Sequence, residues 1–309
     1  MTLTASILIP THNAGNEFEK TLKAVFSQKG VSFEALVLDT ESSDGTREIA
    51  ERYGAKTISV IKQRDFWHGK ARNTLARSAK GEFLVFLTQD AVPADSDWLK
   101  GLLSGFGNKK VAGVYGRQLP KKNASSLERI FYEKKYSSKP IEWNSGNWRL
   151  ENILFSNVNS AVPRKLFLEN QFSEQTIVSE DYEWALRMME KGYSIAYEPK
   201  AAVFHSHNLG LWRTFQKHFD IGYSYRQIFK GRHKRYKQTF FLSGIGFYCL
   251  LICENLWRLK RLDFLWLPQL ILNGKARLLG ILLGKKIAPL LPRSINRLFS
   301  GQKYFWDKK

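Results

Sequence analysis

Short apolar runs and helix-like stretches alternate along the first part of the chain. The apolar runs are candidate strands with the sequences ASILI, EALVLD, KTISVI and EFLVFL. The helix-like stretches fall between them, over residues 16–27, 46–53 and 69–79. This alternation is typical of βα units that build a parallel sheet. Runs as continuously apolar as FLVFL predict strands that are buried on both faces.

The rest of the chain divides into an irregular stretch, a further α/β part and a basic tail. Residues 111–172 are rich in Asn, Ser, Trp and Lys, and they predict a mixture of strands and loops. A helical pattern follows Ser179 until Gly192 supplies a stop, and two strand-like pieces, YSIAY and AAVFH, come next. After His207 the segments become helix-like, so we predict an α/β domain over 1–207 and a helical region over 208–309.

The net charge separates the last third of the chain from the rest. The 309 residues are 43% hydrophobic and 25% charged, which is typical of a globular protein and excludes wholesale disorder. The net charge is +20, and residues 200–309 contribute 21 Lys and Arg against four Asp and Glu. Such a region can bind nucleic acid, an anionic membrane or an acidic ligand, and charge alone does not choose among them.

Apolar runs inside the basic region favour a membrane surface as its partner. Residues 239–253 are uncharged and 264–272 are apolar, but charged residues separate the two runs. Because a spanning helix needs about 20 apolar residues, helices that lie in the membrane interface fit better. A basic helical cap or homo-oligomer contact and a true span are the alternatives. No recognised nucleic-acid motif accompanies the charge, so we expect no nucleic-acid partner.

Two features predict a cytoplasmic location. The start MTLTASILIP lacks the basic residues and long apolar run of a signal peptide. The two cysteines, Cys249 and Cys253, are four apart on one helical face, which argues against a disulfide framework or a zinc site. We therefore expect the protein at the cytoplasmic face of the cell membrane, attached peripherally.

Polar residues follow the predicted strands at the edge where an open α/β sheet binds ligands. The informative strand ends carry PTHN at 10–13, DTESSDGT at 39–46, TQDA at 88–91 and HSH at 205–207. Neither GxGxxG nor a P-loop follows the first strand, so the dehydrogenase and P-loop interpretations lose their main support. A strand-end carboxylate paired with a distant His suits a hard divalent cation that bridges a diphosphate.

Six motifs together resemble the family 2 glycosyltransferases of GT-A fold. They are SILIPTHN, VLDTESSDGT, FWHGKARN, FLTQDAVP, SEDYEWALRM and VFHSHN, and they span residues 5–208 in this order. TQDA, FSNVNSAVPR and HSHN together look like the bacterial rhamnosyltransferases that build surface polysaccharides. The resemblance implies a mixed, mainly parallel sheet flanked by helices, with the basic helical region appended.

The resemblance also implies which residues bind a nucleotide-sugar donor. The donor site is assigned to Pro10, Thr11, Asn13, Asp39, Glu41, Arg72, Asn73, Gln89 and Asp90. Asp39 is expected to contact the base and Glu41 to lie near the ribose. Arg72 and Asn73 are expected to approach the nucleotide and diphosphate; a solvated helical arginine is the alternative for Arg72.

One carboxylate of the family's metal-binding DxD motif is missing from this chain. Thr88 stands in place of the first aspartate and Gln89 in the middle, which leaves Asp90. We expect Asp90 to hold Mg²⁺ or Mn²⁺, with His205 as the second contact and weak affinity for the cation without donor. The alternatives are a helix-capping role for Asp90 and a core histidine bonded to the backbone for His205.

The SEDYEWALRM segment is expected to supply the catalytic base. The resemblance favours Asp181 beside Glu180, with Glu183 in reserve; stabilisation of a helix N-terminus is the alternative for the pair. Asn157, Asn159 and the stretch 143–148 are predicted to meet the acceptor sugar. Trp184 is predicted either to stack on that sugar or to pack in the core.

These assignments predict an inverting glycosyltransferase. The resemblance implies transfer of L-rhamnose from dTDP-rhamnose to a lipid-linked saccharide in cell-surface polysaccharide synthesis. A transferase of the same fold that uses a UDP-hexose or UDP-N-acetylhexosamine is the alternative within the class. A non-catalytic membrane or nucleic-acid-binding protein is the alternative from other classes.

Overall fold

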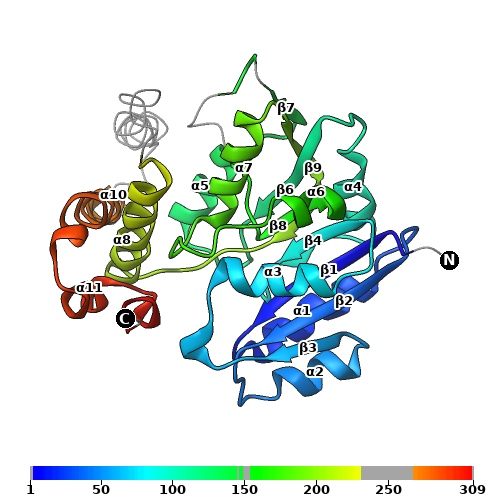
Figure 1. The fold of residues 1–309 in the computed structure, drawn as a ribbon, viewed down its shortest axis with the longest axis horizontal. Helices are drawn as coiled ribbons and strands as arrows, with labels where there is room; N and C mark the ends of the chain where they lie inside the picture. Colours follow the sequence, from blue (N-terminus) through cyan, green and yellow to red (C-terminus); the bar gives the residue numbers. More distant parts are fainter. Residues whose placement is uncertain (1–2, 145, 149–153, 231–266, 308–309) are drawn as a thin grey trace. The chain divides into compact units, whose positions relative to one another are not determined.

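The computed structural model describes residues 3–144, 146–148, 154–230 and 267–307, which form two compact units (Figure 1). Unit 1 comprises Met1–Glu174 and Glu180–His207, and unit 2 comprises Gln175–Ser179 and Asn208–Lys309. The chain therefore contributes a short segment to unit 2, returns to unit 1, and enters unit 2 again for its last part.

One sheet runs through unit 1, and its first half is parallel. The strands lie in the order β3, β2, β1, β4, with the bounds β1 Ala5–Thr11, β2 Phe33–Asp39, β3 Lys56–Val60 and β4 Phe83–Leu87. These are the four strands that the apolar runs predicted, and the side chains of Leu84–Leu87 are buried as expected. The register pairs Thr11 with Asp39, so β1 and β2 end level with each other.

The second half of the sheet is mixed. It adds β8 Asn159–Pro163, β6 Val111–Leu119 and β9 Ser194–Phe204, with β5 Val92–Pro93 and β7 Ile141–Trp143 paired to β9. Among the described strand pairs four are parallel and four antiparallel, so the predicted mixed sheet is confirmed but is less parallel than expected. The two strand-like pieces after Gly192 form the single strand β9, because an irregularity opposite Gly116 and Arg117 accommodates Pro199.

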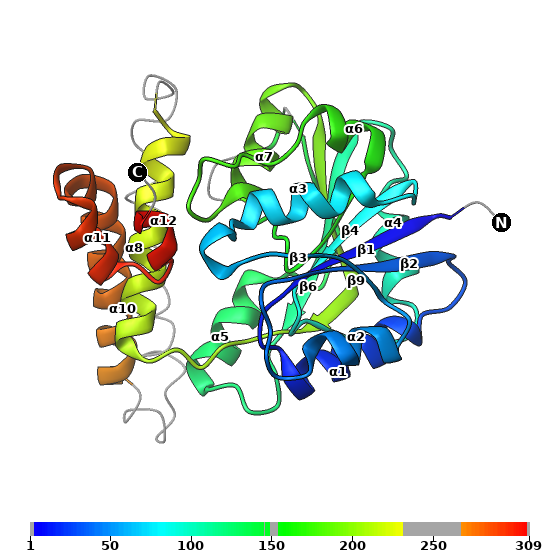
Figure 2. The same cartoon turned by 60° about the horizontal axis from the view of Figure 1, so that its bottom comes forward.

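Helices cover both faces of the sheet. Their bounds are α1 Gly15–Phe26, α2 Thr46–Arg52, α3 His68–Ser78, α4 Trp98–Ser104, α5 Ser126–Lys135, α6 Arg164–Glu169 and α7 Glu180–Glu190. Figure 2 shows α3, α6 and α7 on one face and α1 and α2 on the other. α1 buries Phe18, Leu22 and Val25, the stripe that faces the core. α5 and α6 lie in the stretch where the sequence indicated only strands and loops.

Unit 2 is helical in its described part. Its elements are α8 Leu211–Ile228, α10 Leu267–Leu282, η4 Leu283–Ile287, η5 Ala288–Leu290, α11 Arg293–Phe299 and α12 Lys303–Asp307. A small core of Ile177, Phe215, Phe219, Ala288 and Trp306 holds them together. α8 and α10 approach closely, since a Cβ on Gly280 would lie 2.6 Å from the carbonyl oxygen of Phe215.

Part of the predicted membrane region lies outside the described residues. This applies to Cys249 and Cys253, to the run 239–253 and to the first residues of 264–272. Within the described residues, no helix combines the length and the apolar character needed to cross a membrane.

Candidate active site

The loops after β1 and β2 are joined through a buried carboxylate. Thr11 Oγ1 donates to Asp39 Oδ1 at 3.0 Å, and the Ser42 hydroxyl and backbone N–H donate to the same carboxylate at 2.6 and 2.9 Å. Asp39 is fully buried. Its charge is therefore compensated by hydrogen bonds that also fix the strand ends.

Two residues in left-handed backbone conformation shape the same edge. Asn13 has φ 43° and Glu41 has φ 47°, an arrangement that Asn tolerates better than most residues. Asn13 Oδ1 accepts from the Ser43 N–H at 3.0 Å, and Glu41 Oε2 accepts from the Gln63 N–H at 2.9 Å. Pro10 pairs with Leu38 in the ladder beneath them. The structure thus brings Pro10, Asn13 and Glu41 to one edge of the sheet, beside Thr11 and Asp39.

Gln89 ties the loop after β4 to the loop after β1. Its Oε1 accepts from the His12 N–H at 2.8 Å, and its Nε2 donates to the His12 carbonyl at 3.2 Å. The side chain that stands at the middle position of the DxD motif therefore binds the backbone N–H and carbonyl of His12 with its amide oxygen and nitrogen.

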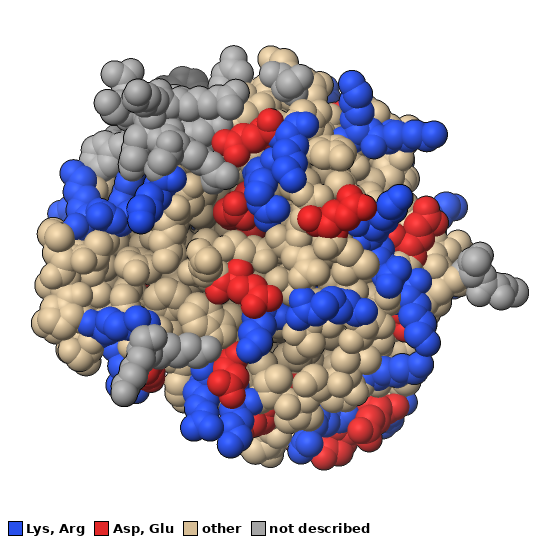
Figure 3. Space-filling model, in the orientation of Figure 1, with Lys and Arg blue, Asp and Glu red and all other residues tan. Residues whose placement is uncertain are grey.

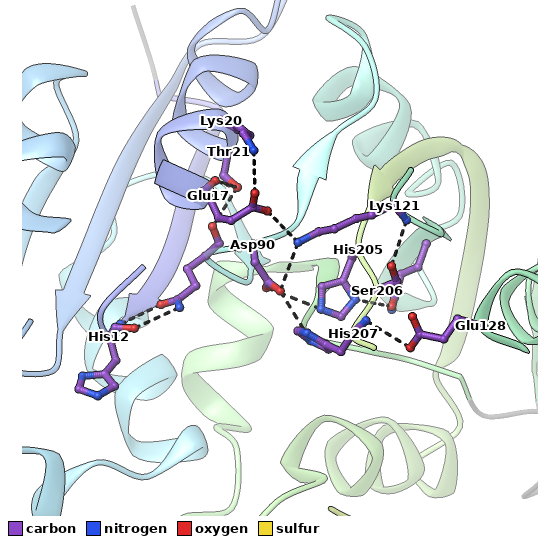
Figure 4. Close-up of polar contacts among 12 residues, drawn as sticks. His12, Glu17, Lys20, Thr21, Asp90, Lys121, Glu128, His205, Ser206 and His207 are labelled. Atoms are coloured by element: carbon purple, nitrogen blue, oxygen red, sulfur yellow. Dashed lines mark hydrogen bonds and ion pairs between the residues drawn. The ribbon is translucent and has the colours of Figure 1, made fainter. Parts of the chain in front are cut away.

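Asp90 lies beside two histidines, and the three form a candidate cation site (Figure 4). His205 Nε2 is 3.6 Å from Asp90 Oδ1, and His207 Nε2 is 3.6 Å from Asp90 Oδ2. His205 Nδ1 lies 3.2 Å from Gln118 Oε1, so a proton on Nδ1 leaves the Nε2 lone pair directed at the site. One carboxylate and two imidazoles suit a divalent first-row transition-metal ion better than Mg²⁺, which prefers oxygen ligands. Sequence reasoning did not assign His207 to the site, although the HSH spacing places both histidines after one strand.

Two further charged residues, neither predicted, lie next to Asp90. Lys121 follows β6, and its Nζ is 3.9 Å from Asp90 Oδ2 and 3.0 Å from Glu17 Oε2. Glu17 belongs to the first turn of α1, and bonds from Lys20 and Lys121 lower its pKa. No motif marks Lys121, because β6 brings it to the site from a stretch that the sequence left irregular.

Two adjacent carboxylates, Glu180 and Asp181, stand at the start of α7. Glu180 Oε1 accepts from Arg72 Nη1 and from Asn157 Nδ2, both at 3.1 Å, and both the Glu180 and Arg72 side chains are buried. The Asp181 carboxylate accepts from the Asn157 N–H at 2.9 Å and from the Tyr182 N–H at 2.8 Å. Asn157 therefore holds both acids, and Arg72 is a buried ion-pair partner rather than a solvated helical residue.

Asp181 and the nearby His68 both have shifted pKa values. Burial, together with the negative charge of Glu180, raises the pKa of Asp181 to about 6. Burial and the nearby Arg72 lower the pKa of His68, at the start of α3, to about 4. At neutral pH the site therefore combines an ionised Asp181 of raised basicity with a neutral His68.

Three predicted site residues are occupied by structural bonds. The Asn73 amide donates to the Phe172 carbonyl and to Glu174 Oε1, both at 3.0 Å. Asn159 is buried, donates to the Ala201 carbonyl at 2.8 Å and accepts from Trp98 Nε1 at 2.9 Å.

Trp184 completes this group of structural residues. It is fully buried in the core, and its Nε1 donates to the Asn170 carbonyl. Because the polar groups of Asn73, Asn159 and Trp184 are already bonded inside the protein, we no longer assign donor or acceptor contacts to them.

The fold is that of the GT-A sugar transferases. A solved structure with the same architecture is the mannosyltransferase PcManGT from Pyrobaculum calidifontis, in complex with GDP-Man and Mn²⁺. The likeness covers 99% of this chain and 86% of that one, with a TM-score of 0.58 at 17% sequence identity. The predicted fold class is therefore confirmed.

The sequence comparisons give the family. The family model for glycosyl transferase family 2 matches residues 6–167. The O-antigen chain rhamnosyltransferase RfbN of Salmonella typhimurium is 34% identical over 98% of this chain and 96% of its own length. An undecaprenol-linked glycan beta-1,3-glucosyltransferase of Campylobacter jejuni is 27% identical over 62% of this chain and 63% of its own length. The chain belongs to glycosyl transferase family 2 and is a glycosyltransferase, as the six motifs predicted.

Proposed function

We propose that this enzyme transfers L-rhamnose from dTDP-rhamnose, with inversion, to a lipid-linked saccharide in surface polysaccharide synthesis. The near full-length similarity to RfbN, which is named as an O-antigen chain rhamnosyltransferase, supports the sugar and the pathway class. The observation that carries the transfer chemistry is Asp181, a carboxylate fixed by two backbone N–H groups and raised in pKa to about 6.

Asp181 acts as the general base in this proposal. The attacking acceptor hydroxyl gives its proton to the Asp181 carboxylate while its oxygen bonds to the anomeric carbon, and the bond from that carbon to the diphosphate breaks with its electron pair leaving on the nucleotide. A pKa of about 6 leaves the carboxylate ionised at neutral pH and still basic enough to accept the proton. Glu180 and Arg72 position the base through Asn157 and the buried ion pair.

Asp90, His205 and His207 would hold a divalent cation at the diphosphate. Such a cation, when bound, neutralises charge on the leaving nucleotide. With one carboxylate in place of two, the protein alone supplies few negative ligand atoms, so we expect the cation to bind weakly without the donor. Pro10, Thr11, Asn13, Asp39 and Glu41 are proposed to form the nucleotide end of the donor site.

We further propose that residues 1–207 form the catalytic domain and that 208–309 attach it peripherally to an anionic membrane, where a lipid-linked acceptor is available. Of the 15 large apolar side chains exposed in the described residues, 12 belong to unit 2, among them Leu290, Leu298 and Trp212. On the face in Figure 3, the part of unit 2 at the left is mainly neutral, with Lys and Arg at its edges. Apolar side chains that enter lipid beside cations that meet its headgroups fit this attachment.

The test is a panel of donors. Transfer and donor hydrolysis would be measured with dTDP-rhamnose, UDP-hexoses and UDP-N-acetylhexosamines, each with Mn²⁺, with Mg²⁺ and with EDTA. We expect dTDP-rhamnose to be the only donor in the panel that is turned over, and preference for a UDP sugar would overturn the rhamnose assignment. Flotation of the full chain with vesicles containing anionic lipid, compared with neutral vesicles, tests the membrane attachment.

A further inference from the structure

A lysine faces the candidate cation site, which is an unfavourable place for a second positive charge. Lys121 Nζ lies 3.9 Å from Asp90 Oδ2, the oxygen that His207 also approaches at 3.6 Å. The Lys121 backbone is held in place, because its N–H donates to Ser206 Oγ at 3.0 Å, between the two histidines. Figure 4 shows the side chain reaching from the segment after β6 toward Asp90.

The charges around this lysine do not balance once a cation is bound. Glu17 compensates Lys20 at 2.7 Å as well as Lys121 at 3.0 Å, so one carboxylate serves two ammonium groups. Asp90 is left to serve the cation, with Glu128 as the next carboxylate, which accepts from the His207 N–H at 3.2 Å. These three carboxylates do not balance two ammonium groups and a divalent cation, and Thr88 adds no charge where the DxD motif has a second carboxylate. A divalent cation beside Lys121 is therefore repelled until an anion joins them. A diphosphate carries the negative oxygens that both positive groups can share.

We propose that Lys121 is a donor-binding residue that donates a hydrogen bond to a phosphate oxygen of the nucleoside diphosphate, beside the cation. This rests on the cation and donor sites of the proposed function. As the bond between sugar and diphosphate breaks, negative charge grows on the leaving group, and the Lys121 ammonium stabilises it there. The same ammonium disfavours the cation on its own, so cation and nucleotide bind together.

The competing explanation is that Lys121 only ties α1 to the segment after β6 through Glu17. The two explanations predict opposite changes in the affinity for the metal ion alone when Lys121 is removed. If Lys121 is only a structural tie, its loss should weaken the binding of every ligand. If its ammonium binds a phosphate, its loss should weaken nucleotide binding but strengthen binding of the metal ion alone. The next residue, Lys122, is exposed and provides a matched control of the same type.

The experiment compares Lys121→Ala with Lys122→Ala in the full chain. Calorimetry would measure the Kd for Mn²⁺ alone, for dTDP and UDP with Mn²⁺, and for dTDP and UDP in EDTA. We expect Lys121→Ala to raise the Kd for the nucleoside diphosphate about tenfold and to lower the Kd for Mn²⁺ alone about threefold, because one partly exposed charge is removed. Lys122→Ala should leave all values within about twofold of the wild type.

Several outcomes overturn the proposal. Unchanged diphosphate binding in Lys121→Ala does so, and so does Mn²⁺ alone binding more weakly. If Lys121→Ala does not fold, Lys121→Arg and Glu17→Ala replace it. Arg keeps the charge and should keep diphosphate binding. Glu17→Ala removes the tie while keeping the lysine, so diphosphate binding should also survive, and its loss would favour the structural explanation.

A further result separates this proposal from the proposed function. If wild-type protein binds dTDP equally well in EDTA and in Mn²⁺, the cation site fails. The EDTA arm of Lys121→Ala still tests the lysine in that case.

Discussion

Asp181 and Asp90 are both proposed to act on the same reaction, yet the protein holds them in opposite ways. Asp181 accepts two backbone hydrogen bonds at 2.8 and 2.9 Å, and its neighbour Glu180 is pinned by a buried arginine. Asp90 has partners at 3.6, 3.6 and 3.9 Å, beyond ordinary hydrogen-bond length. A base has to be in position before the acceptor arrives, whereas a cation site can be completed by the charges that the donor brings.

The largest effect should come from the rigid side of this comparison. Asp181→Asn keeps the shape of the side chain but cannot accept the proton, so transfer should fall by about 10³-fold or more. Binding of dTDP with Mn²⁺ should remain unchanged, as measured by calorimetry. Glu183→Gln on the same helix is the control. A large loss in Glu183→Gln together with retained turnover in Asp181→Asn would move the base to Glu183.

The loosely held side should respond less strongly. Asp90→Asn removes the one carboxylate of the cluster, and we expect transfer to fall about 10²-fold, with a matching loss of Mn²⁺ dependence. Asp97→Asn is a suitable control, because Asp97 is exposed and its side chain forms no cap bond to α4. Equal Mn²⁺ dependence in Asp90→Asn and wild type would remove Asp90 from the cation site.

The pH profile sharpens the description of Asp181. With its pKa raised to about 6, protonation below that pH should lower kcat/KM about tenfold per pH unit. Glu180→Gln removes the neighbouring negative charge, which makes ionisation of Asp181 easier and should shift this acid limb to lower pH. An acid limb that stays in place would mean that another group controls it.

The smallest expected effect concerns His207. Its side chain is 43% exposed, whereas His205 is 8% exposed, so solvent can replace it more easily as a cation contact. We expect His207→Ala to weaken Mn²⁺ in the presence of dTDP by about tenfold or less, and His205→Ala to weaken it more. Titration of Mn²⁺ by electron paramagnetic resonance would rank the two. The reverse ranking would make His207 the principal ligand.

Sequence alone predicted the parallel half of the sheet, because β1, β2 and β4 are nearly continuous apolar runs with a turn at their ends, and β3 is a short run of β-branched residues between two helical stretches. It missed the helices α5 and α6, whose segments are short and polar, and it divided β9 in two at Pro199. The hydrophobic pattern of a segment indicates which of its residues are buried. It does not indicate which distant segment packs against them.

The candidate site could likewise be predicted only in part from the sequence. Asp90, His205, Asp181 and Glu180 could be predicted as site residues because they stand in recognisable motifs at strand or helix ends, and their roles stay predictions. Asn159 and Trp184 stand in motifs as well, but their side chains turn into the core. Lys121 stands in none, and only the pairing of β6 with β8 and β9 brings it beside Asp90.

The Gln89 amide has a consequence for how the enzyme can diversify. Its two hydrogen bonds to His12 close a ring through β1 and β4, so neither loop can shift without carrying the other. In the proposed donor site, the distance between the residues at the nucleotide base and those at the phosphates would then be fixed. Under the proposed function, a change of sugar specificity would therefore have to come from residues outside these two loops.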